Sequence, residues 1–276
     1  MSRVPRPPLH ELIDDLYYLE GAPPYPWLTL PPAPSALLIV NLGAPFRTRA
    51  RSDLQPAEYA DGVVVSTLTR ALEFAYPAGT RSVGVHFKPW GLAPFLGLPA
   101  VELRDRPVTV EEVWGRPATE ELRDRLATAA GPREMLTLLE EQLMRRVCET
   151  AGLALVRHTS SVIAAATGAV AIGDLSVAAG VSGNHLAQRF KEVVGITPKR
   201  LARTYRFAAT VLSIDPAGPV DWLELAANGG YYDQAHFVNE FRAFTGLTPT
   251  RYLDVRRRFL REHPGHVFDG GPLPAV

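Results

Sequence analysis

The stretch LSVAAGVSGNHLAQRFKEVVGITP at 175–198 is followed by a second version of itself, LAANGGYYDQAHFVNEFRAFTGLTP at 225–249. Leu175 aligns with Leu225 and Phe190 with Phe241, so the second copy has one extra residue between its glycine and its later helix. Similarity at a fixed offset indicates one supersecondary unit that is used twice. These two copies decide the architecture of the second half of the chain.

After the glycine of each copy, apolar residues recur at i, i+4 and i+7, which predicts an amphipathic helix with one buried stripe. A short helix is expected before the glycine. Two helices joined by a glycine-containing turn form a helix-turn-helix, whose second helix enters the major groove of DNA. The stripe residues are Leu186, Phe190 and Val193 in the first copy and Phe237, Phe241 and Phe244 in the second.

The face opposite each stripe gives the candidate base contacts. Gln and Asn side chains can make paired hydrogen bonds to adenine, while Ala and Val offer an apolar surface to a thymine methyl group. The alternative for each residue is an ordinary solvated surface position. The candidates are Asn184, Ala187 and Gln188 in the first copy and Gln234, Ala235, Val238 and Asn239 in the second.

The paired motifs resemble those of the AraC/XylS-type transcription regulators, over about Thr159 to Phe259. In that family two helix-turn-helix units are joined by a long helix, and each ends with Phe, four residues, Gly, an apolar residue, Thr or Ser, and Pro. Arginine is common in the family where this chain has Gln188 and Asn239, which turns our expectation from guanine toward A·T pairs. The resemblance also implies a less specific second unit.

Charge is distributed unevenly although the chain carries no formal net charge. The first 157 residues hold 17 Lys and Arg against 19 Asp and Glu, whereas residues 158–262 hold 12 against 9. Local positive charge is what contact with phosphates requires. The candidate phosphate contacts are Lys191, Arg200, Arg203, Arg206 and Arg242, although each could be an ordinary solvated charge.

A single helix is expected between the two units, from Pro198 to about Ile214. At ~1.5 Å per residue it would be about 25 Å long. That length suits two recognition helices on successive turns of one groove face, about 34 Å apart.

The first half of the chain gives a different pattern. Proline is dense through Pro34, which predicts irregular chain with only a short strand at 16–19. Short β-branched and aromatic runs then follow at 37–41, 63–65, 72–76 and 83–87. They predict a small antiparallel barrel or sandwich, cupin-like in architecture. Two helices are expected after it, at 119–130 and 132–150.

The expected fold class is therefore α+β with two domains. A β-rich sensory or regulatory domain with a helical linker would span 1–151, and the all-α pair of helix-turn-helix units would span 152–262. The Gly- and Pro-rich tail at 263–276 is expected to be disordered. Aromatics in a small barrel are more often core than pocket, but the residues to inspect for an effector pocket are Trp27, Phe46, Phe74, Tyr76, His86, Phe87 and Trp90.

No catalytic constellation is apparent in the sequence. The strand region contributes His86 alone, which is too few for a metal site, and we expect neither metal nor cofactor. Cys148 is the only cysteine, which excludes an internal disulfide and fits a reducing compartment. We expect it to be a small buried hydrophobe. His263 and His266 fall in the tail, while His185 and His236 occupy the same place in both copies and suggest a structural part in the turn.

The sequence accordingly predicts a cytoplasmic, sequence-specific transcription regulator whose partner is double-stranded DNA. Neither a signal peptide nor an apolar run of about 20 residues is present, so no membrane partner is expected. RNA polymerase, a small-molecule effector and a second copy of the chain are further candidate partners. Two other classes stay open: a ligand-binding or catalytic barrel with a non-functional helical half, and an architectural DNA binder without a ligand.

Overall fold

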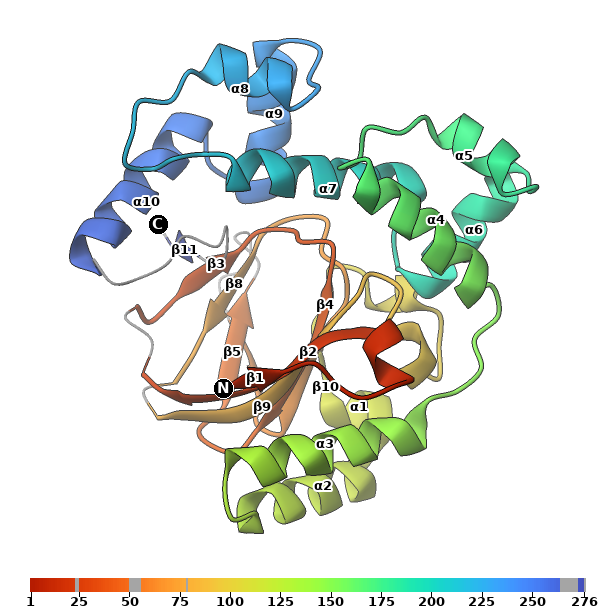
Figure 1. Cartoon of the computed structure of the whole chain (residues 1–276). Coiled ribbons are helices and arrows are strands. Elements are labelled where there is room, and N and C mark those ends of the chain that lie inside the picture. The colour runs from red at the N-terminus through yellow and green to blue at the C-terminus, as the bar shows by residue number, and fades with distance from the viewer. Residues whose placement is uncertain (23–24, 50–55, 78, 264–272, 276) are drawn as a thin grey trace.

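Two antiparallel sheets from the first part of the chain lie against a helical second part (Figure 1). The structure is a computed structural model, and it describes residues 1–22, 25–49, 56–77, 79–263 and 273–275. The first sheet has the order β1 (Ser2–Arg3), β2 (Ile13–Gly21), β9 (Thr80–Phe87), β4 (Ala36–Asn41), β7 (Gly62–Val65) and β10 (Val108–Thr109). The second has the order β11 (Leu273–Pro274), β3 (Leu28–Leu30), β8 (Leu72–Ala75), β5 (Phe46–Arg49) and β6 (Ala57–Tyr59).

The central strands of the first sheet are apolar on both faces because both faces are covered. In β4, Leu38 belongs to the core on the helical side, whereas the next residue, Ile39, belongs to the core between the sheets. In β7, Val64 and Val63 divide in the same way. Successive side chains of a strand point to opposite faces, so an unbroken apolar run marks a strand that is buried twice.

The predicted β-rich domain is confirmed, as a sandwich. The two sheets form separate hydrogen-bonded ladders and do not close into a barrel. The core between them includes Phe46, Leu72 and Phe74 from the second sheet and Val63 and Val65 from the first.

The outer face of the first sheet is covered by helices. Leu122 and Leu126 of α2, with Leu136 and Leu139 of α3, share a core with Val85 of β9. The helices and turns of this half are η1 (Leu9–Glu11), η2 (Ala93–Phe95), η3 (Ala100–Leu103), α1 (Val110–Trp114), α2 (Arg116–Thr128) and α3 (Pro132–Arg146).

Three expectations for this half were wrong. The proline-rich start contains a nine-residue strand, β2, because its whole length pairs with β9 and buries Ile13 and Leu16. Helix α3 ends at Arg146, four residues before the predicted end. Cys148 therefore lies beyond the helix and is exposed, not buried.

The predicted disordered tail is also wrong at its end. Leu273 and Pro274 pair with Thr29 and Leu28 as strand β11, and the backbone N–H of Ala275 donates to Trp27 O at 3.0 Å. Residues 264–272, including His266, and residue 276 lie outside the described residues. A segment from beyond the helical half thus completes a sheet of the first half.

The helical half contains two short helix pairs on either side of one long helix, α7, which runs across the sandwich in Figure 1. Gly168, at φ +80°, lets the first pair approach α7, because a Cβ there would lie 2.0 Å from Ala202 O. The helices are α4 (Leu153–Ala165), α5 (Ile172–Ala178), α6 (Gly183–Val193), α7 (Pro198–Leu212), α8 (Trp222–Asn228), α9 (Gln234–Thr245) and α10 (Pro249–Glu262).

Candidate nucleic-acid interface

Each repeat is a helix pair whose second helix begins at a side-chain cap. In the first unit the hydroxyl of Ser182 accepts from His185 N at 3.2 Å. In the second, the carboxylate of Asp233 accepts from His236 N at 2.6 Å. Caps of this kind satisfy backbone donors that have no partner inside the helix. The shared position of the two histidines therefore coincides with the third helical residue, whose N–H meets the cap.

The Thr-Pro pair that ends each repeat begins the next helix. Thr197 accepts from Arg200 N at 3.2 Å, and Thr248 accepts from Arg251 N at 3.3 Å. Proline follows each cap at the first helical position, where a missing N–H costs little. The repeated motif thus starts α7 after the first unit and α10 after the second.

The apolar stripes are buried as predicted. Leu186, Phe190 and Val193 of α6 are at most 1% exposed, and Phe237, Phe241 and Phe244 of α9 are fully buried. The first stripe joins the core that continues into the β-rich half, whereas the second forms a core of its own with α7 and α10. The opposite faces of α6 and α9 are therefore the faces available to a partner.

The candidate base contacts lie on those opposite faces. Asn184 and Gln188 are exposed and Ala187 is half-buried, while Gln234, Ala235 and Asn239 are exposed and Val238 is half-buried. Gln188 is not idle, because its Nε2 donates to Glu192 Oε1 at 2.8 Å. Its amide must leave or share that carboxylate in order to meet a base edge.

Tyr232 was not among the sequence candidates, yet it is 93% exposed directly before α9. Val181 and Tyr231 both pack into cores, and Ser182 and Asp233 are both caps, so Tyr232 is the residue that the second copy adds. The one-residue difference between the copies was the signal that could have found it.

The candidate phosphate contacts fall into two groups. Lys191 and Arg206 are half-buried and Arg242 is exposed, with the guanidinium of Arg206 5.7 Å from the ring centre of Tyr231. Arg200 and Arg203 instead have protein partners. Arg200 donates to Thr69 O in the β-rich half, and Arg203 Nε donates to Glu240 Oε2 at 2.6 Å.

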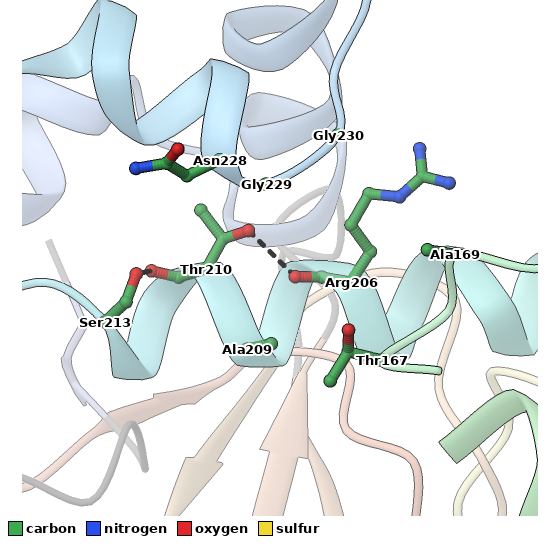
Figure 2. Close-up of a pocket in the computed structure, with 9 residues that line it drawn as sticks. All are labelled: Thr167, Ala169, Arg206, Ala209, Thr210, Ser213, Asn228, Gly229 and Gly230. Carbon is green, nitrogen blue, oxygen red and sulfur yellow. Dashed lines mark hydrogen bonds between the residues drawn. The ribbon is translucent and has the colours of Figure 1, made fainter. Parts of the chain in front are cut away.

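Two hollows lie along α7 between the helix pairs. One, of about 240 Å³, has Arg206 as its only charged lining residue, and the hydroxyls of Thr210 and Ser213 are bonded to carbonyls of α7 itself (Figure 2). The other, of about 620 Å³, is lined by Lys199, Arg203, Arg206, His236 and Glu240 among others. The surface between the units is thus mainly basic, which suits an anionic partner.

Burial shifts three ionisable groups along α7. Desolvation lowers the pKa of Arg200, with the nearby charge of Arg203 acting in the same direction. Burial raises the pKa of Tyr205 to about 12, helped by the charge of Asp14. Burial also raises the pKa of Tyr231, helped by Glu240. Tyr205 and Arg200 therefore place α7 close against the β-rich half.

The candidate pocket residues do not share one cavity wall. Phe46, Phe74 and Tyr76 contact one another in the core between the sheets, with ring centres 4.9–5.6 Å apart. Phe87 and Trp90 belong to the core on the helical side. His86 stacks on Tyr17 at 4.6 Å and bonds Asp15 through Nδ1, while Trp27 lies 4.2 Å from the guanidinium of Arg49.

Metal and membrane features were searched over the same described ranges. Within them no group of three or more His, Cys, Asp or Glu side chains could hold a metal ion. No helix within them is both long and apolar enough to cross a membrane.

Comparison with known families decides the class of the helical half. Residues 175–255 match the family described as Helix-turn-helix domain. The second half carries an AraC-type helix-turn-helix domain. Residues 1–109 match a second family, described as Domain of unknown function (DUF6597). The AraC-type domain contains both repeats and α7, so the predicted double unit is confirmed.

No curated protein matches the sequence. Among solved structures, ToxT from Vibrio cholerae is similar at 8% identity and a TM-score of 0.46, over 87% of this chain and 96% of that one. ToxT with a bound unsaturated fatty acid is similar at 10% and 0.43, over 88% and 94%. ToxT bound to (E)-4-(8-methylnaphthalen-1-yl)but-3-enoic acid is similar at 10% and 0.46, over 87% and 97%. The assignment of the second half rests on the helix-turn-helix match and on the geometry of the repeats.

Proposed function

We propose that the protein is a cytoplasmic, sequence-specific transcription regulator that presents α6 and α9 to successive major-groove segments of one DNA duplex. The observation that carries this proposal is the pair of capped helices, each with a buried apolar stripe and a polar opposite face. Helix α7 joins them with 15 residues, about 22 Å at ~1.5 Å per residue.

The base-reading role belongs to the exposed faces of α6 and α9. Asn184, Ala187 and Gln188 would read the first half-site, and Gln234, Ala235, Val238 and Asn239 the second. Amide side chains suit adenine, and the small apolar ones suit the thymine methyl group. We therefore expect A·T-rich half-sites.

The phosphate-contacting role suits Lys191, Arg206 and Arg242 best, since the structure gives no salt-bridge partner to any of these three within the described residues. Arg200 and Arg203 each donate one N–H to a protein oxygen. A phosphate contact by either would use the remaining guanidinium donors. Such contacts fix the position of the protein on the duplex without reading its sequence.

Selection of bound DNA from a random pool, with the full chain, tests this function. We expect an enriched motif with two A·T-rich half-sites about one helical turn apart, ~34 Å between centres. Affinity for that motif should fall with rising salt, because bound phosphates release counterions. A pool without any enriched motif would contradict sequence-specific binding.

We further propose that the β-rich half regulates the AraC-type domain. It shares a continuous core with the first unit and holds Arg200 of α7 through the carbonyl of Thr69. An effector would act by changing the population of arrangements that present both recognition helices. Trp27, Phe46, Phe74, Tyr76, His86, Phe87 and Trp90 remain our candidates for its contacts.

Thermal unfolding of the full chain with a panel of small molecules tests this second proposal. A true effector should raise the midpoint of unfolding and change the affinity for the selected DNA, since binding to the folded state stabilises it. A ligand that shifts the midpoint without changing DNA affinity would not be a regulator. RNA polymerase and a second copy of the chain are proposed as further partners.

A further inference from the structure

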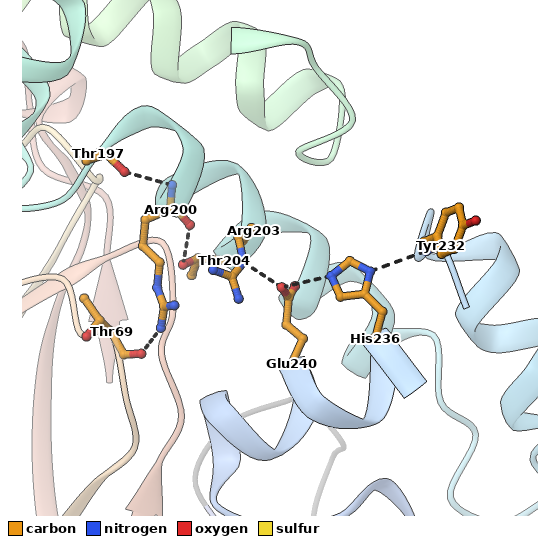
Figure 3. Close-up of polar contacts among 8 residues, drawn as sticks. All are labelled: Thr69, Thr197, Arg200, Arg203, Thr204, Tyr232, His236 and Glu240. Atoms are coloured by element: carbon orange, nitrogen blue, oxygen red, sulfur yellow. Dashed lines mark hydrogen bonds and ion pairs between the residues drawn. The ribbon is translucent and has the colours of Figure 1, made fainter. Parts of the chain in front are cut away.

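A buried carboxylate joins the second recognition helix to α7. Arg203 Nε of α7 donates to Glu240 Oε2 of α9 at 2.6 Å, and the side chain of Glu240 is only 1% exposed (Figure 3). A buried carboxylate is costly unless a charged donor compensates it. Glu240 is therefore compatible with the fold only while α9 stays where Arg203 can reach it.

Aromatic contacts place α9 on the same part of α7. Phe207 of α7 lies 5.3 Å from Phe241 and 4.8 Å from Phe244, ring centre to ring centre. The guanidinium groups of Arg200 and Arg203 lie 4.5 and 5.9 Å from the ring centre of Phe244. Apolar contacts hold the helices together but are non-directional. The ion pair adds a specific direction to this interface.

The first unit lacks this ion pair. In the repeat, Glu240 aligns with Arg189, and Arg189 pairs at 2.7 Å with Glu192 of its own helix. The first recognition helix is instead held by its share of the core that extends into the β-rich half. A directional link to α7 at this position is thus a property of the second unit.

The link extends from Glu240 to the turn that precedes α9. His236 Nε2 lies 3.9 Å from Glu240 Oε2, and His236 Nδ1 accepts from Tyr232 N at 3.4 Å. That turn leads directly into Gln234 and Ala235, two of the candidate base contacts. The orientation of α9 and the position of its first turn are therefore both tied to Arg203, as Figure 3 shows.

We propose that Arg203 and Glu240 are positioning residues that fix the second recognition helix on α7 and so set the half-site spacing that the protein accepts. This inference rests on the proposed DNA-binding function. Removing the pair leaves non-directional packing, which lets α9 rotate on α7. Spacings that differ by one base pair should then be discriminated less.

The test uses the selected motif in a series of duplexes whose half-sites are moved apart or together in single base-pair steps. Wild-type protein should prefer its best spacing over the neighbouring ones by about tenfold, the size of effect of one mismatched base pair. The double variant Arg203→Met/Glu240→Met replaces the ion pair by apolar side chains of similar length, a change that buried ion pairs often tolerate. We expect its preference to fall to about twofold, with affinity for a duplex holding only the first half-site unchanged.

Arg203→Lys keeps the charge without the Nε donor and should lie between wild type and the double variant; it also serves if the double variant does not fold, as judged by thermal unfolding. Arg242→Ala, on the exposed face of α9, is the matched control and should weaken binding at every spacing equally. An unchanged spacing preference in both Arg203 variants would overturn the inference, as would an equal loss at all spacings and at the single half-site. If wild-type protein selects no motif at all, the proposed function fails together with it.

Discussion

Gln188 and Asn239 occupy corresponding places on the two recognition helices, but Gln188 is held by Glu192 through a 2.8 Å hydrogen bond. We predict that Gln188→Ala relaxes the preference at one base pair of the first half-site and costs about 1–3 kcal/mol there. Affinities for the selected duplex and for its single-base variants would measure this. A uniform loss across all variants would instead assign Gln188 to the phosphates.

Arg242 should behave in the opposite way, because it is exposed on α9 and carries a charge that suits a phosphate. We predict that Arg242→Ala lowers the slope of log affinity against log salt by about one unit and leaves the preferred sequence unchanged. Salt titrations of wild type and variant give the slope. An altered base preference would move Arg242 to the base-reading group.

Tyr205 gives a prediction for pH. Burial raises its pKa from about 10 to about 12 in the folded state, with Asp14 as the second cause. The neutral phenol is favoured by folding, so its contribution to stability is intact below about pH 10 and is lost as pH rises toward 12. Urea unfolding between pH 9 and about 12 should show this loss, and Tyr205→Phe should reduce it. An identical pH dependence in the variant would contradict the assignment.

At the residue scale, the sequence was informative where a pattern repeats and uninformative where a contact joins distant segments. The buried stripes and the polar faces of α6 and α9 follow from helical periodicity. Glu240 looked like an ordinary solvated carboxylate, because nothing local shows that Arg203 lies against it. Tyr232 stood out only as a difference in length between two otherwise similar copies.

At the scale of elements, helix ends carry much of the specification. We predict that Thr197→Ala lowers the free energy of unfolding by about 1 kcal/mol, because it removes the cap of α7. Thr250→Ala, at an exposed position within α10, is the matched control and should have a smaller effect. Urea unfolding measures both, and equal losses would show that the Thr197 cap contributes nothing special.

Element types and approximate positions were predicted better than their arrangement. Helix α7 ends two residues before its predicted end at Ile214, and the strands at 37–41, 63–65, 72–76 and 83–87 all appear within a residue or two. Closure into a barrel or separation into a sandwich depends on long-range pairing, which short apolar runs do not encode. The early end of α3 similarly placed Cys148 in solvent.

At the scale of the whole molecule, the two halves meet at several separate places. Tyr25, in the loop before β3, lies 5.8 Å from Phe259 and 5.7 Å from His263, ring centre to ring centre, and donates to the carboxylate of Glu262. Arg200 bonds the carbonyl of Thr69 at the other end of this interface. The core of the β-rich half also runs across the predicted boundary at 151 and 152 into α4 and α6. That boundary stays a prediction.

We predict that Tyr25→Ala speeds hydrogen exchange in the last turns of α10, because it removes the aromatic and carboxylate contacts that hold them. Tyr18→Phe is the matched control, since Tyr18 donates to Glu20 within the same strand. Exchange rates for residues 255–262 in both variants would decide. Unchanged exchange in Tyr25→Ala would show that this contact does not hold the helix end.

Strand β11 has a consequence for how the protein is made. β3 pairs with β8 on one side, and its partner on the other side is synthesised only after the entire AraC-type domain. During translation, that edge of the nascent sheet stays open while every helix emerges from the ribosome. The last pairing of the β-rich half is therefore a late, post-helical event, and a nascent chain arrested after α10 would display an unfinished sheet.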